Sequence, residues 1–240
     1  MILFIKHIEI EGPDMLESFF RQRNFETRII ELQNNDPLPK DFNNIEAVIS
    51  LGGPMNVYEE GKYPFLKGEN RFVKEILSKE IPFVGICLGS QILAKACGAK
   101  IKKSPEREIG FYPVEIKQEG LADKLFEGVD EVLDVFHWHE DMSELPSEAI
   151  WLASSKGCPH QAFKIGPCAY GLQFHIEVTW PTIEKWTEAY FDNTDENQAP
   201  QKQKILEDYL RKNEEFRKIT GTINSNFLNI INRSKHTIGA

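Results

Sequence analysis

The stretch Gly85-Ile86-Cys87-Leu88-Gly89-Ser90-Gln91 decides the fold, and it directly follows the apolar run Ile81-Pro82-Phe83-Val84. Glycines two residues before and two residues after Cys87 permit a tight turn from a buried strand into a helix. The start of that helix offers free N–H groups and a partial positive charge, which favour a thiolate. Cys87 could instead be a buried cysteine acting as a small hydrophobe, but that interpretation leaves the two glycines and Gln91 unexplained.

The first half of the chain alternates apolar runs with helical patterns, which predicts βαβ units around a mostly parallel sheet. The expected strands span 2–8, 25–32, 47–51 and the run before Cys87; the expected helices span 14–23, capped by Asp14, and 65–78. Ligands of such sheets bind beyond the carboxyl ends of the strands. We therefore expect the turn Gly52-Gly53-Pro54 to share one crevice with Cys87.

The second half changes character. Shorter apolar segments predict antiparallel strands at 111–117, 132–138, 150–154, 160–164 and 169–175, followed by a helix over about 181–190. A polar break at 192–204 then precedes apolar residues at roughly helical spacing, which predict one or two amphipathic helices interrupted near Gly221. These helices either cover the core or dock a partner subunit. The pattern divides the chain into a domain at 1–191 and a polar linker with helices at 192–240.

Bulk composition points to an ordinary globular protein. The chain has 240 residues, 41% of them hydrophobic, and only four irregularly spaced cysteines, which predict reduced thiols and a cytoplasmic location. The formal net charge of −9 argues against nucleic acid as a partner. The brief apolar start, 1–5, is too short for a secretory or membrane segment.

A cysteine nucleophile needs a base, and the base needs a group that orients it. In Gly171-Leu172-Gln173-Phe174-His175-Ile176-Glu177, the residues His175 and Glu177 would lie on the same side of a strand, because side chains alternate. A His-x-Glu pair alone is weak support for catalysis. Together with Cys87 it predicts nucleophile, proton shuttle and orienting carboxylate.

Acyl transfer through a thiolate also requires donors for the developing oxyanion. The N–H of Leu88, the residue after the nucleophile, is one candidate, and the N–H of Gly53 is the other. A Gly-Gly-Pro sequence on its own is more often an ordinary turn.

These segments resemble the three motifs of class I, triad-type glutamine amidotransferases. The resemblance extends to 63–66, 108–111 and 135–141, covers about residues 1–190, and is greatest with stand-alone members related to the amidotransferase domain of GMP synthetase. It implies a flavodoxin-like α/β fold: an open, mostly parallel central sheet flanked by helices, with antiparallel additions and here a helical C-terminal extension.

The resemblance also implies a reaction. Cys87 would attack the side-chain amide of glutamine to form a γ-glutamyl thioester, while His175 protonates the departing nitrogen and then activates water. Glu177 would orient the imidazole, and the N–H groups of Gly53 and Leu88 would bind the oxyanion. The residues implied to contact the substrate are Gln91, Trp138, His139 and Glu140.

Three positions depart from the family pattern. Ile176 stands where most relatives have proline, and Trp138 and Glu140 replace smaller residues, so the identity of the substrate stays open. His137 and His139 could suggest a metal pair, but only Glu140 and Asp141 lie nearby in sequence and the resemblance requires no metal. We therefore predict no metal and no cofactor.

The functional alternatives are three. The chain is either a subunit that passes ammonia to a synthase, or a self-sufficient hydrolase of glutamine or another γ-glutamyl compound, because its 240 residues leave no room for an ATP-dependent synthase domain. A non-catalytic regulatory protein with the same fold is the second class. A cysteine peptidase of similar build is the third, distinguished by cleavage of α-peptides.

Overall fold

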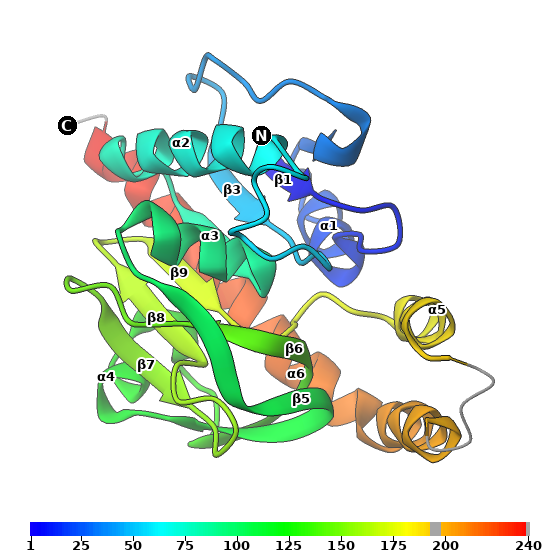
Figure 1. Ribbon diagram of the computed structural model, residues 1–240. Helices are drawn as coiled ribbons and strands as arrows, with labels where there is room; N and C mark the ends of the chain where they lie inside the picture. The colour runs from blue at the N-terminus through cyan, green and yellow to red at the C-terminus, as the bar shows by residue number, and fades with distance from the viewer. Residues whose placement is uncertain (193–197, 239–240) are drawn as a thin grey trace.

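The computed structural model describes residues 1–192 and 198–238. Within these residues the strands form one nine-stranded sheet in the order β2-β1-β3-β4-β9-β8-β7-β5-β6 (Figure 1). The strands are β1 (Ile2–Lys6), β2 (Thr27–Glu31), β3 (Ala47–Ser50), β4 (Phe83–Ile86), β5 (Ile101–Ile116), β6 (Val132–Ser143), β7 (Ile150–Ser154), β8 (Ala162–Ile165) and β9 (Ala169–Leu172). The first five strands of that order pair in parallel and the remaining pairs are antiparallel. The predicted fold class is confirmed.

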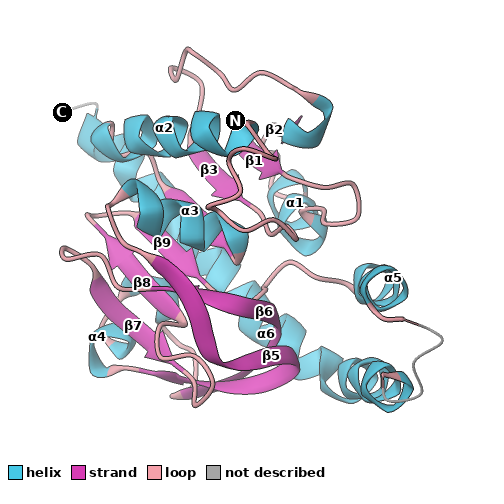
Figure 2. Cartoon of the chain, in the orientation of Figure 1, coloured by secondary structure: helices cyan, strands magenta, loops and turns pink. Residues whose placement is uncertain are grey.

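Helices cover both faces of the parallel part, as Figure 2 shows. They are α1 (Asp14–Arg21), α2 (Phe65–Ser78), α3 (Leu88–Ala96), α4 (Gln118–Leu121), α5 (Trp180–Tyr190) and α6 (Ala199–Ile238), with 3₁₀ turns η1 (Leu32–Asn34) and η2 (Lys124–Phe126). In β1 the side chains alternate: Leu3 and Ile5 pack in the cluster that contains the apolar side of α2, whereas Ile2 and Phe4 pack in the cluster that contains α6. The site therefore rests on a sheet that is buried on both faces.

The strand predicted at 111–117 begins ten residues earlier, at Ile101 of β5, and three further predictions about individual elements were wrong. Asp14 is not a helix cap: it is the first residue of α1, and its carboxylate accepts hydrogen bonds from the hydroxyls of Thr179 and Thr182, which lie at the start of α5. The last strand ends at Leu172 instead of residue 175, and it pairs in parallel with β4 as well as antiparallel with β8. A strand inserted between these two neighbours has no sequence signature that gives its direction.

The third wrong prediction concerns the C-terminal helix, which is continuous through Gly221. The predicted polar break at 192–204 falls partly on 193–197, outside the described residues, and its end is already helical from Ala199. The apolar stripe of α6 joins the main core, and Asn226 donates hydrogen bonds to the carbonyl oxygens of Leu125 and Glu127 at 3.0 and 2.7 Å. The stripe thus covers the core, the first of the two roles considered.

A continuous helix makes a testable prediction at Gly221. A Cβ there would meet nothing within 4 Å, and glycine inside a helix costs about 0.5–1 kcal/mol relative to alanine. We expect Gly221→Ala to raise the free energy of unfolding by about that amount in urea titrations. A loss of stability would indicate that residue 221 is not helical.

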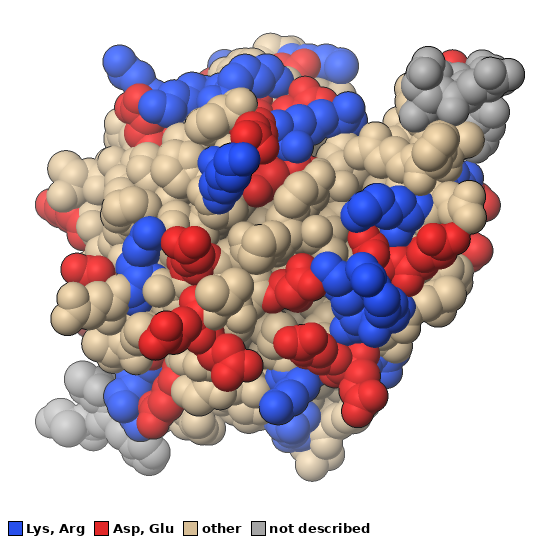
Figure 3. All heavy atoms as spheres, turned by 90° about the horizontal axis from the view of Figure 1, so that it is seen from below, with Lys and Arg blue, Asp and Glu red and all other residues tan. Residues whose placement is uncertain are grey.

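Two surface features bear on partners. The face of the molecule seen in Figure 3 carries acidic and basic side chains interspersed, with no broad basic area. Among the described helices, none combines the length and the apolar character needed to cross a bilayer.

Candidate active site

Cys87 lies at the sharp turn between β4 and α3, with a backbone φ of 50° that side-chain-bearing residues rarely adopt. The two flanking glycines explain how the turn closes. A Cβ on Gly85 would lie 2.4 Å from the carbonyl of Gly89, and a Cβ on Gly89 would lie 2.2 Å from the carbonyl oxygen of Ser50. The glycine spacing is therefore a steric requirement, as the sequence indicated.

His175 lies beyond the end of β9 and forms an isolated bridge to Phe136 of β6, through its N–H and the Phe136 carbonyl oxygen at 2.8 Å. Its Nδ1 is 2.6 Å from Oε1 of Glu177, whose other oxygen accepts a hydrogen bond from the N–H of Ile176 at 2.9 Å. The two side chains meet as predicted, although not as neighbours on a regular strand. Within the described residues Nε2 of His175 has no hydrogen-bond partner, so this nitrogen is available to exchange a proton with the Cys87 thiol or a ligand.

The three predicted catalytic residues converge. A Cβ built on Gly52 would lie 3.1 Å from Cε1 of His175 and 3.8 Å from Cβ of Cys87, which places imidazole and thiol around the same point. Burial works against the charged imidazole, but the Glu177 carboxylate and the neighbouring Cys87 sulfur outweigh it and raise the pKa of His175 well above its usual 6.5.

This arrangement predicts the effect of Glu177→Gln on the titration of His175. Removing the carboxylate removes the strongest influence that favours imidazolium, while the burial that opposes it and the effect of the Cys87 sulfur both remain, so the pKa of His175 should fall. NMR titration of the ring resonances, assigned by comparison with His175→Gln, measures this change. An unchanged midpoint in Glu177→Gln would show that Glu177 does not control the protonation of His175.

A cavity of about 380 Å³ surrounds these groups. Glu177 is the one predicted site residue that does not line it, because it lies behind the imidazole; the predicted residues that do are Gly53, Cys87, Leu88, Gln91, Trp138, His139, Glu140 and His175. Sequence motifs far apart in the chain thus meet at the carboxyl ends of the parallel strands, as the topology requires.

The residues that carry the two predicted oxyanion donors are packed against each other. A Cβ on Gly53 would lie 2.8 Å from Cδ2 of Leu88, so the backbone at residue 53 lies directly against the Leu88 side chain. Neither the N–H of Gly53 nor that of Leu88 donates a hydrogen bond within the described residues. Both are free to bind a ligand oxygen.

A buried hydrogen-bonded chain holds the Gly52–Gly53 turn in place. The two ring nitrogens of His7 lie 2.9 Å from the carbonyl oxygen of Gly52 and 2.7 Å from a carboxylate oxygen of Glu69. The hydroxyl of Ser50 donates to the other oxygen of Glu69 at 2.6 Å. The sequence analysis did not identify His7 as part of the site, because its partner Glu69 is on α2.

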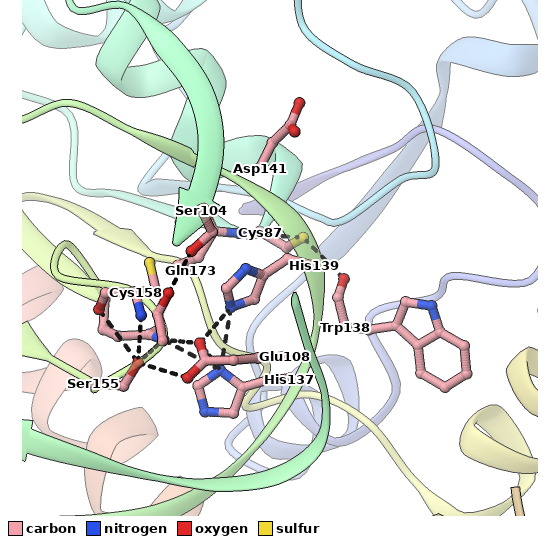
Figure 4. A network of polar contacts seen from close by, with 12 residues as sticks. Cys87, Ser104, Glu108, His137, Trp138, His139, Asp141, Ser155, Cys158 and Gln173 are labelled. Atoms are coloured by element: carbon pink, nitrogen blue, oxygen red, sulfur yellow. Dashed lines mark hydrogen bonds and ion pairs between the residues drawn. The ribbon is translucent and has the colours of Figure 1, made fainter. Parts of the chain in front are cut away.

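Gln91 contacts the protein around the nucleophile. Its side-chain amide donates to the carbonyl oxygen of Asp141 and to Oε1 of Gln173, both at 3.2 Å. Gln173 in turn donates to the thiol of Cys87 at 3.5 Å, and the Cys87 sulfur lies 3.8 Å from the carbonyl oxygen of Trp138 (Figure 4). Gln173 was not singled out from the sequence, although it lies two residues before His175.

The side chains of residues 138–140 point in three different directions. The Trp138 ring packs on Trp186 with a centroid distance of 5.7 Å. His139 points inward, with Nε2 3.1 Å from Glu108, and Glu140 points outward, 2.9 Å from Arg107. The bulk of Trp138 and the charge of Glu140 are thus both accommodated at the cavity edge.

Three potential metal ligands lie together at Glu108, His137 and His139 (Figure 4). One potential ligand atom from each residue lies within 4.8 Å of those of the other two. They are the residues of the described chain that could hold a metal ion, and Glu108 is the third member that sequence reasoning did not find. The Glu108 carboxylate also accepts hydrogen bonds from Ser155 and Gln161, both at 2.6 Å. These bonds satisfy the buried carboxylate with partners from the protein. No observation tests the prediction of no metal, which stays a prediction.

Glu11 is a further cavity residue that the sequence analysis missed. It follows β1, is 7% exposed, and accepts a hydrogen bond from the hydroxyl of Tyr190 at 3.0 Å. Burial raises the pKa of the Glu11 carboxyl, against the opposing effect of the nearby His175 ring. The available signal was its place after a buried strand, at the same sheet edge as Gly52.

Comparison with known proteins places this geometry in a family. Residues 14–189 match the family model described as glutamine amidotransferase class-I. The chain belongs to the class I glutamine amidotransferase family. Its relatives include the glutamine amidotransferase-like protein YfeJ of Salmonella typhimurium, which is 32% identical over 184 residues, 75% of this chain and 77% of YfeJ.

Two further comparisons give the extent of the likeness. A crystal structure of a glutamine amidotransferase from Thermotoga maritima is 38% identical, with a TM-score of 0.86 and coverage of 96% of this chain and 97% of that one. The GMP synthase of Thermosipho africanus is 36% identical over 151 residues, which are 62% of this chain and 26% of its own length. About three fifths of this chain therefore corresponds to about a quarter of that GMP synthase, whereas nearly the whole chain corresponds to the Thermotoga protein.

Proposed function

We propose that this class I amidotransferase hydrolyses the γ-glutamyl amide of glutamine, or of a related γ-glutamyl compound, through a thioester on Cys87. The observation that carries the proposal is the convergence of Cys87 and His175 around Gly52, with Glu177 bonded to the far side of the imidazole at 2.6 Å. This arrangement supplies a nucleophile, a proton carrier and an orienting group in one cavity.

The first half of the reaction forms the thioester. The Cys87 sulfur attacks the γ-carbonyl carbon, and the carbonyl oxygen takes the negative charge between the N–H groups of Gly53 and Leu88. His175, in its protonated form, gives its proton to the amide nitrogen as the C–N bond breaks. Ammonia or an amine leaves, and the γ-glutamyl group remains on sulfur.

The second half regenerates the enzyme. The now neutral imidazole of His175 takes a proton from water, whose oxygen attacks the thioester carbon. The C–S bond breaks, glutamate leaves, and the proton held by His175 restores the thiolate and imidazolium pair or the neutral pair. Glu177 keeps Nε2 directed at the thiol side throughout, and Gln91 with the backbone of residues 138–140 would bind the amino-acid end of the substrate.

The fate of the nitrogen divides the proposal into two forms. The likeness to GMP synthase supports the form in which the chain passes ammonia to a separate synthase subunit. The 97% coverage of the stand-alone Thermotoga protein supports the form in which the chain works without a synthase. Glutamate release from glutamine by the isolated chain, measured with and without an added synthase, distinguishes the two. If no glutamate forms in either case from glutamine or from related γ-glutamyl compounds, and a glutamine-site alkylating agent leaves Cys87 unmodified, the proposed function is excluded.

A further inference from the structure

The cavity contains a carboxylate that the proposed reaction does not use. Oε1 of Glu11 accepts the hydrogen bond from Tyr190, but within the described residues Oε2 accepts none, and no Lys or Arg pairs with either oxygen; the ionisable groups of basic type that act on it are His175 and His7. Glu11 is nevertheless 7% exposed and lines the cavity. A buried carboxylate that has a free oxygen and no Lys or Arg partner would stabilise a positively charged ligand group in the cavity.

The position of Glu11 assigns it to the leaving-group side. A Cβ on Gly52 would lie 2.5 Å from Oε2 of Glu11 and 3.1 Å from Cε1 of His175, so carboxylate and imidazole border the same space. His175 is the group that meets the departing nitrogen. The amino-acid end of the substrate would instead lie toward Gln91, whose amide is held by Asp141 and Gln173.

Aromatic rings complete this end of the cavity. Trp138, Trp186 and Tyr190 line it, with the Trp138 ring centroid 5.7 Å from that of Trp186 and 5.8 Å from that of Tyr190. Aromatic faces attract ammonium groups, and a carboxylate beside them adds a charge-assisted hydrogen bond. The combination is typical of a site for an alkylammonium group.

The cationic side chains of the cavity do not offset Glu11. Lys103 lies 2.8 Å from Asp141 and Arg107 lies 2.9 Å from Glu140. Both are therefore paired with carboxylates of β6, and within the described residues Glu11 has no Lys or Arg partner, although the His175 ring lies near it.

We propose that Glu11 and the three rings bind a protonated amino group of the leaving amine, so that the preferred substrates are γ-glutamyl amides of diamines or polyamines. The proposal rests on the proposed function. Hydrolysis would break the γ-carbonyl C–N bond and release the whole amine, with the proton on the departing nitrogen supplied by His175 and the oxygen on glutamate supplied by water. Such a substrate must come from a reaction that joins glutamate to an amine.

The test compares two amides of equal length: the γ-glutamyl amide of 1,4-diaminobutane and that of n-pentylamine, whose terminal methyl group replaces the ammonium. We expect kcat/KM for the diamine amide to be on the order of tenfold higher, and Glu11→Gln to abolish that preference. Glu9→Gln makes the same change of charge at an exposed position of the same loop and should retain the preference. Tyr190→Phe keeps the ring, removes the hydrogen bond to Glu11 and should lower the preference partly.

Equal rates for the two amides in the unmodified protein would overturn the inference and leave the proposed function intact. It would also be overturned if Glu11→Gln changed discrimination between γ-glutamyl and glutaryl amides instead, because Glu11 would then bind the α-amino group. Calorimetric binding of both amides to Cys87→Ala gives the same comparison without turnover, so a chain that hydrolyses neither amide is still tested. If Glu11→Gln does not fold by circular dichroism, Tyr190→Phe alone decides the outcome: an unchanged preference refutes the inference.

Discussion

Replacing Cys87 by alanine should reduce glutamate release from glutamine by on the order of 10⁴-fold or more. Without the sulfur no thioester can form, and the oxyanion donors and His175 can then only assist direct attack by water. The variant should fold normally, because a cysteine that is 7% exposed loses little packing when its sulfur faces a cavity. A coupled assay of glutamate, read against the thermal unfolding midpoint, separates loss of chemistry from loss of structure.

The other cysteines supply the control. Burial raises the pKa of Cys158 to about 12 and that of Cys168 to about 11, so both thiols stay protonated at neutral pH. Cys97 does not line the cavity. Cys97→Ala should therefore retain glutaminase activity within about twofold, the range expected of a change away from the site. If Cys87→Ala retained activity while Cys97→Ala lost it, the assignment of the nucleophile would be wrong.

Much of the fold follows from local sequence because the parallel strands are buried on both faces. The helix 65–78 has the predicted bounds, and the strand at 47–50 differs from its prediction by one residue. The direction of β9 could not be predicted, because it depends on which strands flank it. The unbroken α6 was missed because glycine usually weakens a helix, whereas here core packing on both sides of Gly221 carries the helix through.

The candidate site divides in the same way. Cys87, His175 and Glu177 could be predicted because each lies in a short motif whose glycines or spacing have a steric or geometric reason. Glu11 and Glu108 could not, since their importance comes from residues 164 and 31 positions away that only the folded chain brings near. Both carboxylates are buried, which hydropathy patterns do not indicate for an acidic residue.

The largest effect on stability is expected at Gly89, in the first turn of α3. An alanine Cβ there would lie 2.2 Å from the carbonyl oxygen and 2.7 Å from the carbonyl carbon of Ser50, which are backbone atoms of the central strand β3. Ser50 cannot move away easily, because its hydroxyl is bonded to the buried Glu69 at 2.6 Å. We expect Gly89→Ala to lower the free energy of unfolding by about 3 kcal/mol or more.

Gly68→Ala is the matched substitution. Gly68 lies inside α2, where a Cβ would meet nothing within 4 Å, so alanine should raise the free energy of unfolding by about 0.5–1 kcal/mol. Urea titrations of both variants at pH 7 would show midpoints displaced in opposite directions. If Gly89→Ala were as stable as the unmodified protein, the close contact between the Cys87 turn and β3 would not exist as described. The position of Cys87 beside Gly52 would then need revision, because that same contact sets the distance between the nucleophile and the Gly52–Gly53 turn.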